Sequence, residues 1–252
     1  MQMCRGILTG ISLALLPMSG VQASDQWSGF FLGAGGGGSK LQERLDRTFT
    51  AVTPFGTTFD GGADEPLFTV LGGYRIRHNN LVFGAEGSFT GIDAEFNGAA
   101  CPVPTTAACA SVGADGTLSN LWRGRVSVGA LLNEKTLISI AGGISAADVS
   151  FTGFTAQGVA GSAVATATAF GPPVDETTTG YNIGASIERK VSDRVSFRFE
   201  GIYDRVDGPD LGAFSAAAFA GDGTLEGAAS VQQTGDFPIE IYSFQAILMF
   251  DF

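Results

Sequence analysis

Eight segments of the chain alternate between apolar and other side chains with a period of two residues, the pattern of β-strands with one apolar face. The alternation is clearest over residues 239–252, where Tyr242 and Phe244 share one parity and Ser243 and Gln245 share the other. The pattern predicts strands at residues 27–38, 67–77, 81–91, 118–130, 136–147, 178–191, 195–206 and 239–252.

The connections between these segments alternate in length. The short ones are residues 78–80, 131–135 and 192–194, and the long ones are residues 39–66, 92–117, 148–177 and 207–238. Short turns on one side and long loops on the other are typical of membrane barrels, whereas a soluble β-sandwich has no reason to keep this alternation. We therefore predict an all-β fold, an eight-stranded antiparallel up-and-down transmembrane β-barrel. Further strands at residues 48–59 or 150–157 would make ten and would favour a pore.

The face opposite the apolar one carries charged residues, which would point into the barrel. They are Arg75, Arg77, Glu86, Arg123, Arg125, Glu188, Arg198 and Glu200, together with Asp204. One interpretation is a pore lining that selects ions. The other, which we favour, is a packed lumen with paired charges, because an eight-stranded barrel is just wide enough for its own side chains. A three-residue turn at 192–194 would set Glu188 directly opposite Arg198.

Aromatic residues at the ends of the apolar faces predict two girdles at the membrane interfaces. One girdle would comprise Trp27, Tyr74, Phe83, Phe197 and Phe252, and the other Phe89, Trp122, Tyr181, Tyr203 and Tyr242.

The N-terminal residues have the features of a secretory signal peptide. Arg5 precedes an apolar run over residues 7–16, and Ala23 ends a small-residue cleavage site. The chain then divides into a signal peptide at residues 1–23 and one barrel domain at residues 24–252. The formal net charge of −11 argues against a nucleic-acid partner.

Two cysteines, Cys101 and Cys109, remain after the signal peptide. In an oxidising compartment this even count favours one disulfide that closes a small loop, and two free thiols are the alternative. No histidine lies nearby, so we expect no zinc site, and the single His78 offers no second axial ligand for haem. No nucleophile and base pair is apparent, so we expect no enzyme and no cofactor.

Several segments resemble the small outer-membrane barrels of Gram-negative bacteria, in particular the opacity-type and OmpA-like porin family of alphaproteobacteria. They are WSGFFLGAGGG, LGGYRIR followed by LVFGAEGSF, WRGRVSVGALL and GYNIGASIERKVSDRVSFRFEGIYDRV. The resemblance implies an outer-membrane location, a role in envelope integrity, and contact with host or surface ligands through the loops. Phe252 resembles the terminal signal that the outer-membrane insertion machinery reads. A narrow porin for small solutes or ions is the alternative function.

Overall fold

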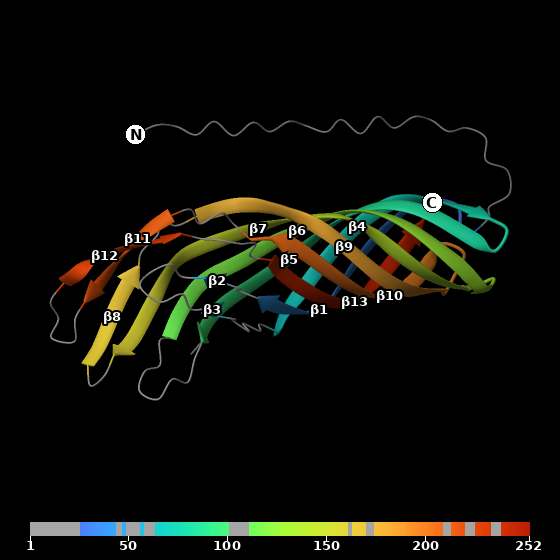
Figure 1. Cartoon of the computed structure of the whole chain (residues 1–252). Helices are drawn as coiled ribbons and strands as arrows, with labels where there is room; N and C mark the ends of the chain where they lie inside the picture. Colours follow the sequence, from blue (N-terminus) through green and yellow to red (C-terminus); the bar gives the residue numbers. More distant parts are fainter. Residues whose placement is uncertain are drawn as a thin grey trace, which may run out of the picture.

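The computed structural model describes residues 26–43, 47–48, 56–57, 64–100, 111–160, 163–169, 174–208, 213–219, 225–232 and 238–252. Its strands are β1 (Gly29–Glu43), β2 (Arg47–Thr48), β3 (Gly56–Thr57), β4 (Asp64–His78), β5 (Leu81–Ala100), β6 (Ser111–Asn133), β7 (Thr136–Ala160), β8 (Ala163–Ala169), β9 (Val174–Lys190), β10 (Val195–Asp207), β11 (Ala213–Phe219), β12 (Leu225–Gln232) and β13 (Pro238–Asp251) (Figure 1). Within these residues we find no helix with the length and apolar character needed to cross a membrane.

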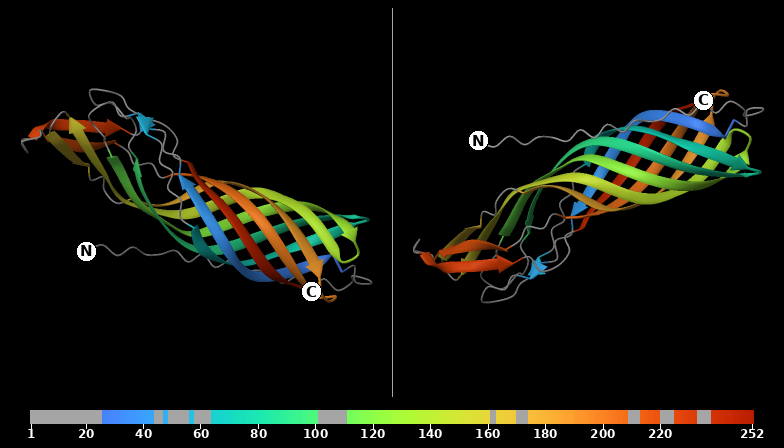
Figure 2. Two further views of the ribbon diagram at one scale, coloured as in Figure 1. Left: turned by 90° about the horizontal axis from the view of Figure 1, so that it is seen from below. Right: turned by 90° about the horizontal axis from the view of Figure 1, so that it is seen from above.

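Eight of the strands form one closed antiparallel barrel. Neighbours pair in the order β6-β5-β4-β1-β13-β10-β9-β7, and β6 pairs with β7 to close the ring. Closure leaves no free edge in the barrel wall, so the backbone hydrogen bonds of its strands are satisfied within the wall. Figure 2 shows these strands tilted around a common axis. The predicted fold class is confirmed.

The ten-strand alternative is wrong. In the structure β2 pairs with β3, outside the barrel. Residues 150–157 continue β7, which runs without interruption to Ala160. A barrel of eight strands has a narrow interior, and its own side chains are large enough to fill it.

Five barrel strands extend well beyond their predicted ends on the long-loop side; β1 is one of them and runs to Glu43. Strand β5 runs to Ala100, β6 begins at Ser111, β7 runs to Ala160 and β9 begins at Val174. The predicted loops at 92–117 and 148–177 are therefore largely strand. Many of their residues are Ala, Gly and Thr, which give little alternation at 98–100 and 111–117. Pairing nevertheless continues from the regular strands of the barrel wall, across irregularities such as that between Ser119 and Leu121. Figure 2 shows this part projecting from one end of the barrel.

Two hairpins complete the projecting part. Strand β8 pairs with the end of β7, and β11 pairs with β12. Strand β11 also lies against β8. The predicted loop at 207–238 thus contains two strands, so much of the long-loop side is β-structure rather than irregular loop.

The short turns lie at the opposite end of the barrel. Within the predicted connection at 78–80, His78 pairs with Leu81, so Asn79 and Asn80 form a two-residue turn, with φ of 57° at Asn79. Asn79 has positive φ and Asn80 does not, so the turn is not of type I′, in which both central residues have positive φ. Strand β6 runs on to Asn133 and pairs with Thr136, so the five-residue turn expected at 131–135 is wrong. An irregularity between Leu131 and Asn133 absorbs the change in register.

The two faces of the barrel wall separate as the alternation predicts. Large apolar side chains stay exposed on the outside, among them Phe244 at 66 % and Ile144 at 73 %. Side chains of the other parity are buried in the lumen, including Gln245 at 1 % and Arg123 at 3 %. An exposed apolar surface of this extent is unusual for a soluble protein and fits the hydrocarbon of a bilayer.

Candidate functional site

The lumen of the barrel holds a balanced set of charged side chains. Five are basic, namely Arg75, Arg123, Arg125, Lys190 and Arg198, and five are acidic, namely Glu86, Glu188, Glu200, Asp204 and Asp251. Each of the ten takes part in at least one ion pair. Charges buried in a low-dielectric interior are stable when they are paired and hydrogen-bonded. All ten have a partner of opposite charge, although Arg125 Nε has no hydrogen-bond acceptor among the described residues.

The centre of the lumen is a chain of shared partners. Glu188 pairs with Arg75 at 3.0 Å and with Arg198 at 3.1 Å, and it accepts a 2.5 Å hydrogen bond from Ser196. Arg198 pairs in turn with Glu86 at 2.8 Å. The predicted register is confirmed, because Glu188 and Arg198 are direct cross-strand partners.

The chain of contacts continues toward the long-loop side. Arg125 pairs with Glu86 and, at 2.7 Å, with Glu200. Gln245 donates to Glu200 at 3.1 Å and accepts from Thr69 at 2.7 Å. The hydrogen-bonded network therefore continues beyond the Arg125–Glu200 ion pair through the neutral side chains of Gln245 and Thr69.

A second ion pair lies beyond this neutral link. The Arg123 guanidinium forms a bidentate ion pair with Asp204, with Nε at 2.9 Å from Oδ1 and Nη2 at 2.7 Å from Oδ2. Arg123 also donates to Thr90 at 2.8 Å, and Thr90 shares a 2.8 Å hydrogen bond with Thr69. Ser145 donates to Asp204 at 2.6 Å. The polar network is therefore continuous along the lumen.

Trp27 closes the network at the short-turn end. Its ring lies 4.9 Å from the Lys190 amine and 4.9 Å from the Arg75 guanidinium carbon, and its indole N–H donates to the Glu134 carbonyl at 2.9 Å. It is fully buried and packs with Val82, Leu131 and Leu137. The prediction that Trp27 lies in an outer girdle is wrong: cation–π contacts and apolar neighbours hold it inside the mouth.

Apolar side chains fill the lumen toward the other mouth. Leu41, Leu118 and Ile241 are at most 1 % exposed. Further buried apolar residues on the inward parity are Leu67, Ile92, Ala94, Leu121, Ala147, Val149, Val206 and Ile239. With Trp27 at one end and this apolar layer at the other, the charged side chains between them are buried from solvent.

The structure brings together seven of the eight residues predicted for the charge network, and Arg77 lies apart from them. Arg77 is at the short-turn end, where its Nε donates to the Asn79 carbonyl at 2.6 Å. Lys190 and Asp251 were missed, although each shares its parity with an inward neighbour on the same strand. Cys101, Cys109 and the predicted signal peptide lie outside the described residues.

Aromatic side chains border the outer apolar surface. On the long-loop side Tyr203 contacts Tyr181 at 6.4 Å and Tyr242 at 5.1 Å, and Phe89 contacts Trp122 at 4.5 Å between ring centroids. At the other end, Phe252 is 77 % exposed, and its N–H donates to the Phe30 carbonyl at 3.0 Å. Such belts mark the depths at which hydrocarbon meets lipid head groups.

Among the side chains that the structure describes, no group of three or more His, Cys, Asp or Glu residues is arranged to hold a metal ion.

No family model matches the sequence, and no curated protein matches it. Solved structures with a similar course of the chain include Neisserial surface protein A, with 13 % identity and a TM-score of 0.44 over 89 % of this chain and 98 % of that one. The attachment invasion locus protein Ail of Yersinia pestis has 12 % identity and a TM-score of 0.40 over 88 % and 99 %. The outer membrane protein OprG of Pseudomonas aeruginosa has 9 % identity and a TM-score of 0.45 over 91 % and 100 %.

Proposed function

We propose that this chain is a non-enzymatic outer-membrane barrel that contributes to envelope integrity and presents its long-loop side to surface ligands. The observation that carries the proposal is the filled lumen. A conducting barrel needs a hydrated path, whereas the side chains of Arg123 and Asp204 are both 0 % exposed and those of Glu188 and Arg125 are both 1 % exposed.

The outer surface supports the membrane location. An apolar band bordered by aromatic side chains has the form that a barrel presents to a bilayer, and closed barrels and helices are the structures that can span one. Export through a signal peptide at residues 1–23, and insertion by machinery that recognises Phe252, belong to the same proposal. We place the short turns in the periplasm and the projecting strands outside the cell.

The projecting strands support an interactive role. They carry acidic residues, among them Asp93, Glu95, Asp148, Asp175 and Glu176. Because β5, β6, β7 and β9 extend continuously from the barrel wall, this acidic surface lies beyond the apolar band. A stable scaffold that displays a charged surface suits a contact function better than transport.

The polar cluster around Asp204 does not support catalysis. Asp204 accepts from Arg123 and Ser145, and Asn182 donates to Ser145 at 2.8 Å, an arrangement with several polar groups close together. Asp204 is nonetheless 0 % exposed inside the barrel, so a substrate has no access to it. Its hydrogen bonds therefore serve to stabilise the lumen.

A planar-bilayer recording on refolded protein tests the proposal against its alternative, a narrow porin. We expect no stable conductance steps from the wild type. Steps of constant size that grow with salt concentration would establish a hydrated path and would reject the filled lumen. A Trp27→Ala variant belongs in the same series, because it removes the side chain that closes one mouth.

A further inference from the structure

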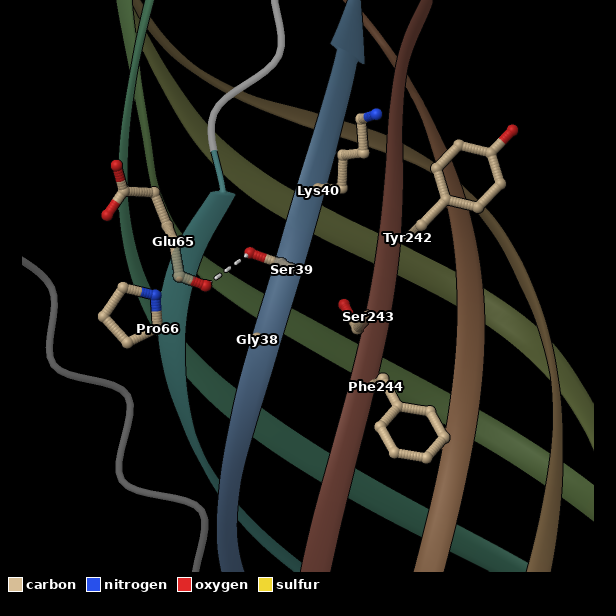
Figure 3. A pocket seen from close by; sticks show the side chains of 8 residues that line it. All are labelled: Gly38, Ser39, Lys40, Glu65, Pro66, Tyr242, Ser243 and Phe244. Atoms are coloured by element: carbon tan, nitrogen blue, oxygen red, sulfur yellow. Dashed lines mark hydrogen bonds between the residues drawn. The ribbon is translucent and has the colours of Figure 1, made fainter.

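A groove of about 500 Å³ lies on the outer surface at the long-loop end of β1. Gly38 forms its floor, between Pro66 of β4 and Phe244 of β13, which are its cross-strand partners. Lys40 and Tyr242, themselves a cross-strand pair, stand at its upper rim (Figure 3). The groove therefore has apolar walls and a cation at one end.

The groove is not required by the internal packing of the chain. A Cβ atom at Gly38 would approach nothing closer than the Glu65 carbonyl oxygen at 4.0 Å, an ordinary contact distance. Glycine within a strand lowers stability, and it often marks a place where another molecule approaches the backbone. The next outward positions of β1 are Gly36 and Ala34, which are also exposed, so a smooth apolar track continues toward the middle of the band.

The position of Lys40 along the barrel is that of lipid head groups. Its partner Tyr242 belongs to the row of tyrosines that borders the apolar band on the long-loop side. Glu65 also lines the groove, but the two side chains form no ion pair within 4.0 Å, and Figure 3 shows the Glu65 carboxylate turned away from the Lys40 amine. Lys40 thus presents a positive charge at the depth where lipid phosphates lie.

From this geometry we infer that the groove binds one phosphate-bearing lipid of the outer leaflet. The phosphate lies against the Lys40 amine, and an acyl chain lies over Gly38 and Gly36 between Pro66 and Phe244. The inference rests on the proposed orientation, which puts Lys40 in the outer leaflet. A second copy of the chain is a poorer occupant, because a symmetric contact would bring two Lys40 side chains together and each chain has a net charge of −11.

Native mass spectrometry of refolded protein in detergent tests this site. The probes are diphosphoryl lipid A and its dephosphorylated derivative. We expect Lys40→Gln to lower the bound fraction of diphosphoryl lipid A about fivefold, the effect of one lysine near an anionic lipid surface. Gly38→Leu fills the groove and should lower binding of both probes. Wild-type protein should retain the phosphorylated probe better than the dephosphorylated one.

Two matched variants serve as controls. Lys135→Gln removes an exposed cation at the opposite end of the barrel. Gly87→Leu fills a larger groove, of about 1130 Å³, whose outward-facing lining includes Leu32, Tyr74 and Val126 and no cation. Neither variant should change binding. A Cβ at Gly87 meets only the Arg123 carbonyl oxygen, at 3.9 Å, so the added side chain is tolerated.

Unchanged binding in Lys40→Gln would overturn the inference. If Gly38→Leu does not fold, the Lys40→Gln result is sufficient to test the site. Equal retention of the two probes would also overturn it. Displacement by millimolar inorganic phosphate would indicate a free-phosphate site, and a dimer lost only in Gly38→Leu would indicate a second copy. Bilayer conductance is an independent measurement, so a conducting lumen would reject the proposed function without affecting this result.

Discussion

Removal of the Glu188 side chain is the most direct test of a packed lumen. Glu188 is 1 % exposed and is the shared partner of Arg75 and Arg198, with Ser196 as a third donor. The Glu188→Ala substitution leaves all three donors without this acceptor. Loss of one side of a buried ion pair destabilises a protein by about 3–5 kcal/mol.

The remaining partners set the expected size of the effect. Arg75 keeps Asp251, and Arg198 keeps Glu86, so neither guanidinium becomes wholly unpaired. We therefore expect a loss of about 3 kcal/mol, at the lower end of the range. The control is Glu176→Ala on the same strand, an exposed position where the change should stay within about 0.5 kcal/mol.

Charge reversal gives a second, sharper result. From the sequence alone, exchange of the two charges in Glu188→Arg with Arg198→Glu should restore part of the lost stability. The structure reverses this expectation. A basic side chain at position 188 would face Arg75, and an acidic one at position 198 would face Glu86. The double variant should therefore be no more stable than Glu188→Ala.

The assay is urea unfolding of protein refolded into liposomes, followed by the fluorescence of the chain's two tryptophans. The denaturation midpoint and slope of each variant are compared with those of the wild type. A hydrated lumen predicts that Glu188→Ala hardly changes stability but alters ion preference. If Glu188→Ala and Glu176→Ala unfold at the same urea concentration, the packed-lumen argument fails.

Three further predictions concern insertion, redox state and topology. Deletion of Phe252 should lower the outer-membrane level of the protein in cell fractions, because the last strand loses its terminal aromatic residue; an unchanged level at moderate expression would contradict this. Thiol labelling of denatured, non-reduced protein should find neither Cys101 nor Cys109 free, and the short loop they close should add little to barrel stability; two labelled thiols would reject the disulfide. Protease added to intact cells should cut within residues 101–110 and spare the Asn79–Asn80 turn, and cleavage at that turn would invert the topology.

The local sequence pattern was sufficient to predict, for much of the barrel wall, which side chains face outward and which face the lumen. Side chains alternate between the two faces of a strand, so the parity of Tyr242 and Gln245 determines which one faces outward. Turn length then determines cross-strand register, as at Glu188 and Arg198. The same rule placed Lys190 and Asp251 inside, and stricter use of it would have added them to the predicted network.

The local sequence pattern was insufficient to predict the ends of strands that are rich in small residues. Residues 98–100 and 111–117 lack alternation, yet they pair because the backbone hydrogen-bond ladder of β5 and β6 continues into them. Residues 92–97 do alternate, with Ile92 and Ala94 buried, and this pattern could have extended the predicted strand. Trp27 was misplaced for a related reason. An aromatic residue at a strand end suits an interfacial girdle, and only the position of Arg75 and Lys190 on the inner wall makes the mouth of the barrel its better environment.

The sequence by itself therefore determined the central parts of the eight barrel strands, the faces of the wall and the register across the turns at 78–80 and 192–194. Each of these depends on residues close together in the chain or joined by a short turn. Closure of the barrel determined the contacts between residues on strands that are not adjacent in the wall. Arg75 meets Glu188, and Arg125 meets Glu200, across strands that are not neighbours in the wall. The groove between Pro66 and Phe244 likewise exists because β1 separates two distant strands. Such contacts depend on the tilt and stagger of the closed sheet, which no single segment encodes.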